Sequence, residues 1–278
     1  MLLAKKKNTV NIVAQKDSWI LEKLARHLDD ALPYTIWTDV PTGKNSVTYY
    51  INYVQAGITK ASKVECALFT HYEERDIALA SKWWQVADQV DVAVCMSEMY
   101  SKMLRKQKIA TRLIPPGVDL DKYTPDSIKI GVVGTTKATG RKGEDIINSI
   151  MDVPGIELSF TGGTTDWPAN GNYIAENDMP SFYRGLDYVL IASYYEGGPM
   201  CAIEALACGI PLIAPAVGWV PELPHIQFDL GSKADLRSVL LGIVENKNKL
   251  RKSVMDRSWD EYIRKHDILF KELLLRAQ

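Results

Sequence analysis

The stretch Glu196-Gly-Gly-Pro-Met-Cys-Ala-Ile-Glu204 decides the fold that we expect for the second half of the chain. Apolar runs flank it at residues 188–193 and 210–214, and their length and composition are typical of buried strands. Between these runs, Pro199 suits the first position of a helix, and Gly209 suits the residue after the helix ends. The stretch therefore predicts a buried strand, a glycine turn, a short helix and a second buried strand.

The start of this expected helix is a candidate site for an anion. The amides of Met200 and Cys201 would have no partner within the helix, and the helix dipole favours negative charge there, most simply a phosphate. Glu196 precedes the site, and Glu204 lies about two turns into the expected helix. Amides for a diphosphate and carboxylates for sugar and ribose hydroxyls are the parts that a nucleotide-sugar needs.

These residues resemble the signature of retaining GT-B glycosyltransferases of the family 4 type, also called group 1. The family pattern is a glutamate, seven residues, Glu-Ala, and then a small residue, a glycine and an apolar run with a proline, which residues 196–214 follow. Four further segments match in the expected order, namely Ile114-Pro-Pro-Gly-Val-Asp119, Gly131-Val-Val-Gly134, Arg141-Lys-Gly143 and Val217-Gly-Trp-Val-Pro-Glu222. The match is good over residues 110–225 and poor over residues 1–110.

The resemblance implies a GT-B fold, in which two Rossmann-like α/β domains with parallel sheets face each other across a cleft. Strand-like and helix-like segments alternate along the chain, as in a parallel sheet covered on both faces. We expect an acceptor-side domain at 1–126 and a nucleotide-sugar-binding domain at 127–278, with a helix at 259–278 packing back on the first domain. The implied activity is retaining, metal-independent transfer of a sugar from a UDP- or GDP-linked donor to a hydroxyl.

The same resemblance gives roles to single residues. Glu196 is expected to contact hydroxyls of the transferred sugar, and Glu204 those of the donor ribose. Lys142 and Arg141 are adjacent cations that would stabilise the negative charge of the departing diphosphate. His71, which ends an expected strand in the first half, would reach the donor sugar or the acceptor. The other residues expected to bind the donor are Gly134, Thr135, Gly197, Gly198, Pro199, Met200 and Cys201.

Two positions depart from the family pattern. The family usually has an arginine directly after the glycine of the first strand of this domain. Thr135 stands there in this chain, so that Arg141 or Lys137 would do its work. The loop at 15–17 lacks the paired glycines that are common in the family, and Lys16 is its one candidate residue.

We expect neither a metal nor a cofactor beyond the donor itself. Asp119-Leu-Asp121 has the Asp-x-Asp form that holds a divalent ion in other glycosyltransferases, but it follows Pro-Pro-Gly-Val in the expected linker. The histidines show no spacing typical of metal ligands.

Composition and charge narrow the class of protein. The 278-residue chain is 46% apolar with a net charge of −1, which suits two modest globular domains and gives no overall attraction to nucleic acid. The cysteines form no Cys-x-x-Cys pair, the first residues lack the apolar run of a signal peptide, and no run approaches about 18 apolar residues. We expect buried free thiols and a cytoplasmic location. A basic helix is a candidate for peripheral contact with the inner membrane face through Lys102, Arg105, Lys106 and Lys108.

Two other functions stay open on the sequence alone. A nucleotide-sugar epimerase on the same fold would need acid and base side chains that the sequence does not place, and product analysis without an acceptor would reveal it. A non-catalytic relative that binds glycan or protein would suit the short first domain, and an assay of donor hydrolysis would separate it from an enzyme. The acceptor is also open, as a glycan, a lipid, a protein, a small molecule or a modified nucleic acid.

Overall fold

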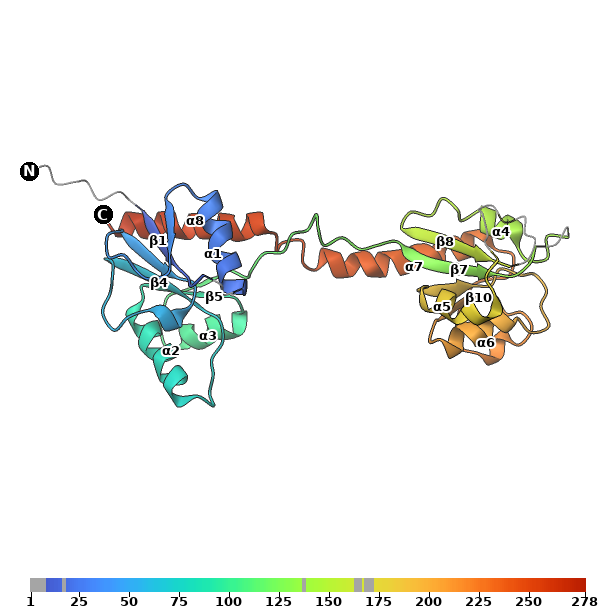
Figure 1. Cartoon of the computed structure of the whole chain (residues 1–278), viewed down its shortest axis with the longest axis horizontal. Helices are drawn as coiled ribbons and strands as arrows, with labels where there is room; N and C mark the ends of the chain where they lie inside the picture. Colours follow the sequence, from blue (N-terminus) through green and yellow to red (C-terminus); the bar gives the residue numbers. More distant parts are fainter. Residues whose placement is uncertain (1–8, 17–18, 137–138, 163–166, 168–172) are drawn as a thin grey trace, which may run out of the picture. The chain divides into compact units, whose positions relative to one another are not determined.

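The computed structural model describes residues 9–16, 19–136, 139–162, 167 and 173–278 (Figure 1). The chain forms two compact units, the first made of Met1–Tyr123 with Val254–Gln278 and the second of Thr124–Ser253. The sequence placed this division after residue 126 and began the returning segment at 259. Of the segments discussed above, the first eight residues, the last residue of the loop at 15–17 and Lys137 lie outside the described residues.

The first unit is built on a six-stranded parallel sheet with the order β2-β1-β3-β4-β5-β6. Its strands are β1 (Val10–Val13), β2 (Thr35–Thr38), β3 (Val47–Tyr50), β4 (Val64–Phe69), β5 (Val92–Cys95) and β6 (Thr111–Leu113). Its helices are α1 (Trp19–Ala31), η1 (Tyr53–Gln55), α2 (Ile77–Gln89), α3 (Glu98–Lys106) and α8 (Trp259–Arg276). Every residue of the four inner strands is buried, which explains their apolar runs.

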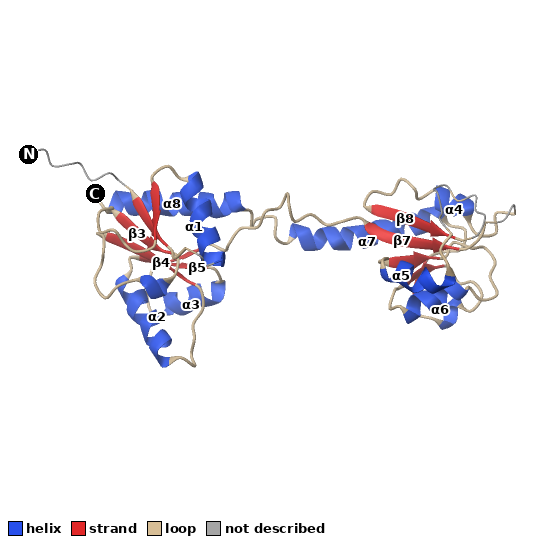
Figure 2. Ribbon diagram, viewed as in Figure 1, coloured by secondary structure: helices blue, strands red, loops and turns tan. Residues whose placement is uncertain are grey.

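Helices cover both faces of this first sheet (Figure 2). On one face, Leu24 and Leu28 of α1 and Phe270 of α8 pack in one core cluster with alternate residues of the inner strands. On the other face, α2 and α3 pack against the intervening strand residues, with Trp83 at the centre of a group of aromatic rings. The returning helix α8 thus completes the core of the first unit.

The second unit contains a five-stranded parallel sheet with the order β11-β10-β9-β7-β8. Its strands are β7 (Ile128–Val133), β8 (Ile156–Thr161), β9 (Tyr188–Leu190), β10 (Leu212–Ala214) and β11 (His225–Gln227). Its helices are α4 (Glu144–Asn148), η2 (Glu176–Asp178), α5 (Met179–Arg184), α6 (Met200–Ala207), η3 (Val220–Glu222) and α7 (Lys233–Lys252). One face of the sheet packs against α4 and α7, and the other against α5 and α6.

Two parallel sheets, each covered by helices on both faces, confirm the predicted class of two Rossmann-like domains. The cleft expected between them stays a prediction. In the second sheet, β7 lies between β8 and β9, so the chain leaves β7 toward one side and returns on the other. Loops that follow such neighbouring strands diverge at the carboxyl edge of the sheet, which is where open α/β sheets bind ligands. The segments after β7 and β9 therefore flank the expected ligand site.

Candidate functional site

Gly143 lets the segment after β7 pack against the end of β9, and Gly134 makes room for the Lys142 side chain. Gly143 has φ +77, and a Cβ there would lie 2.1 Å from the carbonyl oxygen of Ala192. Gly134 has φ +139 and lies beside the Lys142 side chain, whose Nζ would be 3.4 Å from a Cβ at that position. A residue with a side chain at 143 would push the two segments apart. The glycines thus set Arg141 and Lys142 at the carboxyl edge of the sheet.

Glu196 joins both of these cations. Its Oε1 lies 2.6 Å from Nζ of Lys142, and its Oε2 lies 3.3 Å from NH1 of Arg141. Arg141 also donates a hydrogen bond of 2.8 Å to the carbonyl oxygen of Tyr195, which fixes the guanidinium beside the loop. The Glu196 side chain is 9% exposed and that of Lys142 is 16% exposed, so solvent screens their ion pair only weakly. Three of the predicted site residues therefore form one cluster.

The charge state of Glu196 follows from opposing effects. Burial raises the pKa of its carboxyl group, but hydrogen bonds from Lys142 and Ser193 and the charge of Arg141 outweigh this effect. The net pKa of Glu196 lies below its ordinary value, so the group is an anion at neutral pH. In this structure, a carboxylate therefore neutralises the cations that would meet a diphosphate.

Helix α6 begins one residue later than the sequence predicted. Pro199 has extended backbone (φ −67, ψ 112) and precedes the helix, so that Met200 is its first residue. Among the described residues, no side chain accepts a hydrogen bond from the first amides of α6. Cys201 follows, and burial raises the pKa of its thiol to about 12, which keeps it neutral. The amides predicted to face a phosphate are thus left uncapped by side chains.

The two glycines before this helix have different reasons to be there. A Cβ at Gly198 would lie 2.7 Å from the Trp219 ring, whereas a Cβ at Gly197 would meet nothing within 4 Å. A Cβ at Gly218 would lie 2.5 Å from the carbonyl oxygen of Gly197, so the loop that contains Gly218 packs tightly against the loop that contains Gly197. Close packing with Trp219 explains Gly198, and the predicted approach of a sugar to the backbone stays a prediction for Gly197.

Glu204 is the fifth residue of α6, little more than one turn from its start, which corrects the two turns expected from the sequence. Its Oε2 accepts a hydrogen bond of 2.6 Å from the hydroxyl of Tyr183 on α5. Sequence reasoning missed Tyr183, because nothing in its spacing indicates that α5 lies against α6.

A narrow cavity lies next to the cluster. Side chains of Lys142, Glu196, Pro199 and Cys201 line it together with the ends of β7 and β9 and with Trp167. The indole of Trp167 donates a hydrogen bond of 3.0 Å to the carbonyl oxygen of Gly134. The predicted donor residue Thr135 directly follows Gly134 on this edge. Trp167 was also missed, since the surrounding stretch, rich in glycine and threonine, has no hydrophobic periodicity.

Two further predicted residues, His71 and Lys16, belong to the first unit. His71 follows β4 in the first unit, is exposed, and shares a hydrogen bond of 3.0 Å between its Nδ1 and Oγ1 of Thr70. The Nζ of Lys16 lies 5.9 Å from the centroid of the Trp37 ring. The roles expected for His71 and Lys16 stay predictions.

The Asp-x-Asp sequence has a structural use. The Asp119 carboxylate accepts hydrogen bonds from the amides of Asp121 and Lys122, at 3.1 and 3.0 Å, and so stabilises the turn that follows it. In the described parts of the chain, no group of three or more His, Cys, Asp or Glu residues could hold a metal ion. The described helices include none that is long and apolar enough to cross a membrane.

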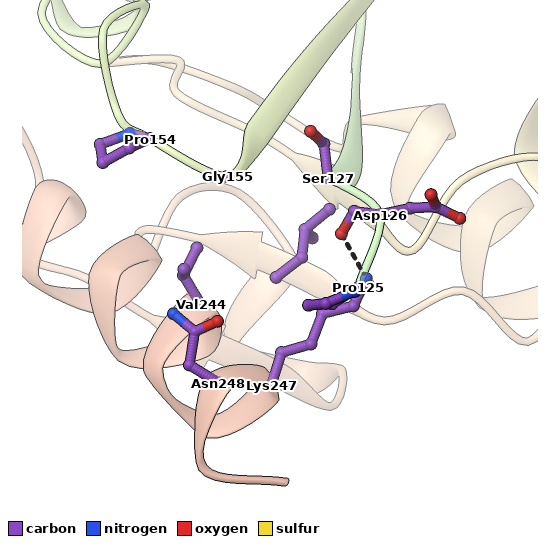
Figure 3. A pocket seen from close by; sticks show the side chains of 9 residues that line it. Pro125, Asp126, Ser127, Pro154, Gly155, Val244, Lys247 and Asn248 are labelled. Atoms are coloured by element: carbon purple, nitrogen blue, oxygen red, sulfur yellow. Dashed lines mark hydrogen bonds between the residues drawn. The ribbon is translucent and has the colours of Figure 1, made fainter. Parts of the chain in front are cut away.

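A second pocket, of about 260 Å³, lies at the opposite edge of the second sheet, before β7 and β8 (Figure 3). Lys247 of α7 donates a hydrogen bond of 2.7 Å to the carbonyl oxygen of Asp126 there. The pocket contains none of the residues predicted for the site. Its lining includes Pro125, Asp126, Pro154, Gly155, Val244 and Lys247.

Fold and geometry together define a two-unit α/β protein with a cation–carboxylate cluster at the carboxyl edge of its second sheet. Residues 171–224 match the family model described as glycosyl transferases group 1. This segment holds Glu196, Glu204 and the whole of α6, so the resemblance seen in the sequence is confirmed over it.

Similarity to curated proteins points the same way. The chain is 26% identical over 181 residues to the D-inositol 3-phosphate glycosyltransferase of Mycolicibacterium smegmatis, covering 49% of this chain and 40% of that protein. It is 41% identical over 68 residues to the protein of the same name from Salinispora arenicola, covering 23% of this chain and 14% of that one. The chain thus spans less than half the length of these relatives.

The chain also resembles solved structures over most of its length. HepE of Anabaena in complex with UDP is 11% identical, with a TM-score of 0.42, and the match covers 95% of this chain and 100% of that one. Sucrose-phosphate synthase from Thermosynechococcus elongatus is 18% identical, with a TM-score of 0.38, over 84% of this chain and 74% of that one. The fold assignment therefore rests on the two sheets themselves.

Proposed function

We propose that the chain is a retaining, metal-independent glycosyltransferase whose second unit binds a nucleotide-diphosphate sugar. The observation that carries this proposal is the cluster of Lys142, Arg141 and Glu196 beside the uncapped start of α6. The glutamates of the group 1 match stand at this cluster and on this helix. The cationic pair and the uncapped amides are suited to the diphosphate of a UDP- or GDP-linked sugar. The carboxylates are suited to hydroxyl groups, Glu196 to those of the sugar and Glu204 to those of the ribose.

The role proposed for the two cations follows from the negative charge that develops on the leaving group. As the bond between the sugar and the outer phosphate breaks, negative charge builds on the departing diphosphate. Lys142 and Arg141 are already held in place, so they stabilise that charge without first having to be reorganised. A fixed pair of cations does here what a divalent ion does in other transferases, which is why we propose that no metal takes part.

The sugar is transferred with retention in this scheme. The acceptor oxygen forms its bond to the anomeric carbon on the face from which the diphosphate leaves, and the acceptor proton passes to an oxygen of that diphosphate. Glu196 orients the sugar through its hydroxyls. Glu204 holds the donor ribose, and the amides at Met200 and Cys201 face the diphosphate.

The acceptor belongs to the first unit in this proposal. His71 lies after β4, at the carboxyl edge of the first sheet, where ligands of α/β sheets bind. Lys102, Arg105, Lys106 and Lys108, on and just after α3, are exposed and would suit peripheral contact with an anionic membrane surface. The curated relatives are named for D-inositol 3-phosphate, and the acceptor proposed for this chain is a compound with a free hydroxyl.

A thermal-shift panel with UDP-, GDP- and ADP-sugars tests the proposal, because a ligand that binds the folded state raises its stability. We expect one nucleotide class to raise the melting temperature, and EDTA to leave both this shift and the transfer rate unchanged. No shift with any of them would refute donor binding, and a strict requirement for Mg²⁺ would refute the metal-free mechanism. Product analysis without an acceptor separates transfer from epimerisation.

A further inference from the structure

Tyr183 lies next to Glu204, and the donor binding proposed above gives it no role. Its ring is 1% exposed and packs in the core cluster between α5, α6 and the sheet. The hydroxyl nevertheless ends at a charged group, 2.6 Å from Oε2 of Glu204. The hydrogen bond from this buried ring limits the positions that the Glu204 carboxylate can take.

The hydrogen bond has a fixed direction. Burial raises the pKa of Tyr183, and the hydrogen bond to Glu204 raises it further, so the phenol keeps its proton and donates. The Oε2 atom of Glu204 is therefore occupied. Its Oε1 atom accepts no hydrogen bond from the part of the chain that the structure describes, and the Glu204 side chain is only partly buried.

A second phenol–carboxylate pair in the same chain shows what a purely structural arrangement looks like. Tyr50 donates a hydrogen bond of 3.0 Å to Oε1 of buried Glu65, and that oxygen also accepts one of 2.7 Å from the amide of Ala61. Gln89 donates to Oε2 of Glu65 at 3.4 Å. Both oxygens of Glu65 are thus used within the protein, whereas Glu204 keeps one oxygen for another partner.

We propose that Tyr183 is a positioning residue that holds Glu204 so that its Oε1 accepts hydrogen bonds from the donor ribose. The site would then select ribonucleoside diphosphates over analogues without ribose hydroxyls. This inference rests on the proposed function. A glutamate on a helix has several rotatable bonds, and a hydrogen bond from a rigid buried ring restricts them before the ligand arrives. An analogue without the hydroxyls leaves Oε1 desolvated and unpaired, which costs affinity.

Titration calorimetry on the full chain tests this proposal. The ligands are UDP and GDP with their 2′,3′-dideoxy counterparts, and the proteins are wild type, Tyr183→Phe and the matched control Tyr50→Phe. Wild type is expected to bind the better ribonucleotide about tenfold tighter than its dideoxy form. Tyr183→Phe should bind that ribonucleotide about tenfold more weakly and the dideoxy form within about twofold of wild type. Tyr50→Phe should bind both as wild type does.

Three results would overturn the inference while leaving the proposed binding of a nucleotide diphosphate in place. Unchanged ribonucleotide affinity in Tyr183→Phe would show that Glu204 needs no positioning. An equal loss for both ligands would show that Tyr183 only supports the fold. Wild type that binds both forms equally would show that the ribose is not recognised, even if the diphosphate is bound. Wild type that binds no nucleotide would instead refute the proposed function, and the inference with it. Thermal melts check folding, and Tyr183→Met replaces the phenylalanine variant if that one does not fold.

Discussion

Replacing Lys142 tests the proposed chemistry at its least exposed cation. The Nζ of Lys142 lies 2.6 Å from Oε1 of Glu196, in a site where both side chains are largely shielded from water. The loss of one electrostatic stabiliser in such a site lowers kcat by about 10²–10³. We expect this reduction for Lys142→Ala, which corresponds to about 2.7–4 kcal/mol of activation free energy.

The same substitution should also lower the free energy of unfolding. Removing one partner of a fully buried ion pair costs about 3–5 kcal/mol, because the other charge is left unpaired. Glu196 keeps Arg141 at 3.3 Å, and the pair is not fully buried, so we expect the smaller cost of about 1–3 kcal/mol. Stability and turnover therefore have to be measured separately.

The assay follows the nucleotide released from a saturating donor at a temperature where the variants are folded, with urea titrations for stability. Lys233→Ala is the matched control, because its Nζ pairs with Asp145 at 3.0 Å in the same unit but with both side chains about half exposed. Such pairs contribute about 0–1 kcal/mol, and the control should keep its turnover. If Lys142→Ala turns over as fast as Lys233→Ala, the role assigned to Lys142 is wrong.

Three further predictions concern neighbouring residues. Glu204→Ala should weaken binding of donor and free nucleotide together by about tenfold, and equal affinities in calorimetry would contradict this. Because the pKa of Glu196 is lower in the folded state than in the unfolded state, its ionised form stabilises the fold above the unfolded pKa, and this contribution is lost as the pH falls through the folded pKa. The melting temperature of Glu196→Gln should therefore fall less than that of wild type between pH 7 and about pH 3. Gly143→Ala should cost about 2–5 kcal/mol in urea titrations, from the left-handed backbone and the clash with Ala192. Gly140→Ala, at φ +69 with open space around it, should cost about 1–2 kcal/mol, and equal costs would rule out the clash.

The sequence predicts the strands and helices well where the hydrophobic pattern agrees with residue types that are typical of helix and strand ends. The inner strands of the first unit are continuous apolar runs because both faces are covered. Serine is a residue type favoured before a helix, and Ser97 accepts a hydrogen bond from the amide of Tyr100 at the start of α3. The three-residue strand β11 was not predicted, since an exposed edge strand that short has no clear alternation. Ile20 has the spacing of the apolar stripe that includes Leu24 and Leu28, but it is 47% exposed because the first turn of α1 extends beyond the core.

The candidate site could be predicted only in part. Glu196, Lys142 and Arg141 were named from the sequence, yet their union in one cluster depends on Gly143 packing against Ala192, a contact that spacing along the chain does not indicate. Tyr183 and Trp167 act through neighbours on other segments, at Glu204 and Gly134, so their partners are set by tertiary packing. Residues whose effect depends on such distant contacts leave no local signal.

The first unit closes its core with a helix that is synthesised after the second unit. The buried rings and leucines of α8 complete the cluster around β3 and β4, although residues 124–253 come between them in the chain. On a ribosome, the second unit is therefore complete while the first still exposes the apolar face that α8 will cover. Domains usually fold in the order of their synthesis. In this chain that order is reversed for the final step, and the nascent first unit is the part that a chaperone would protect.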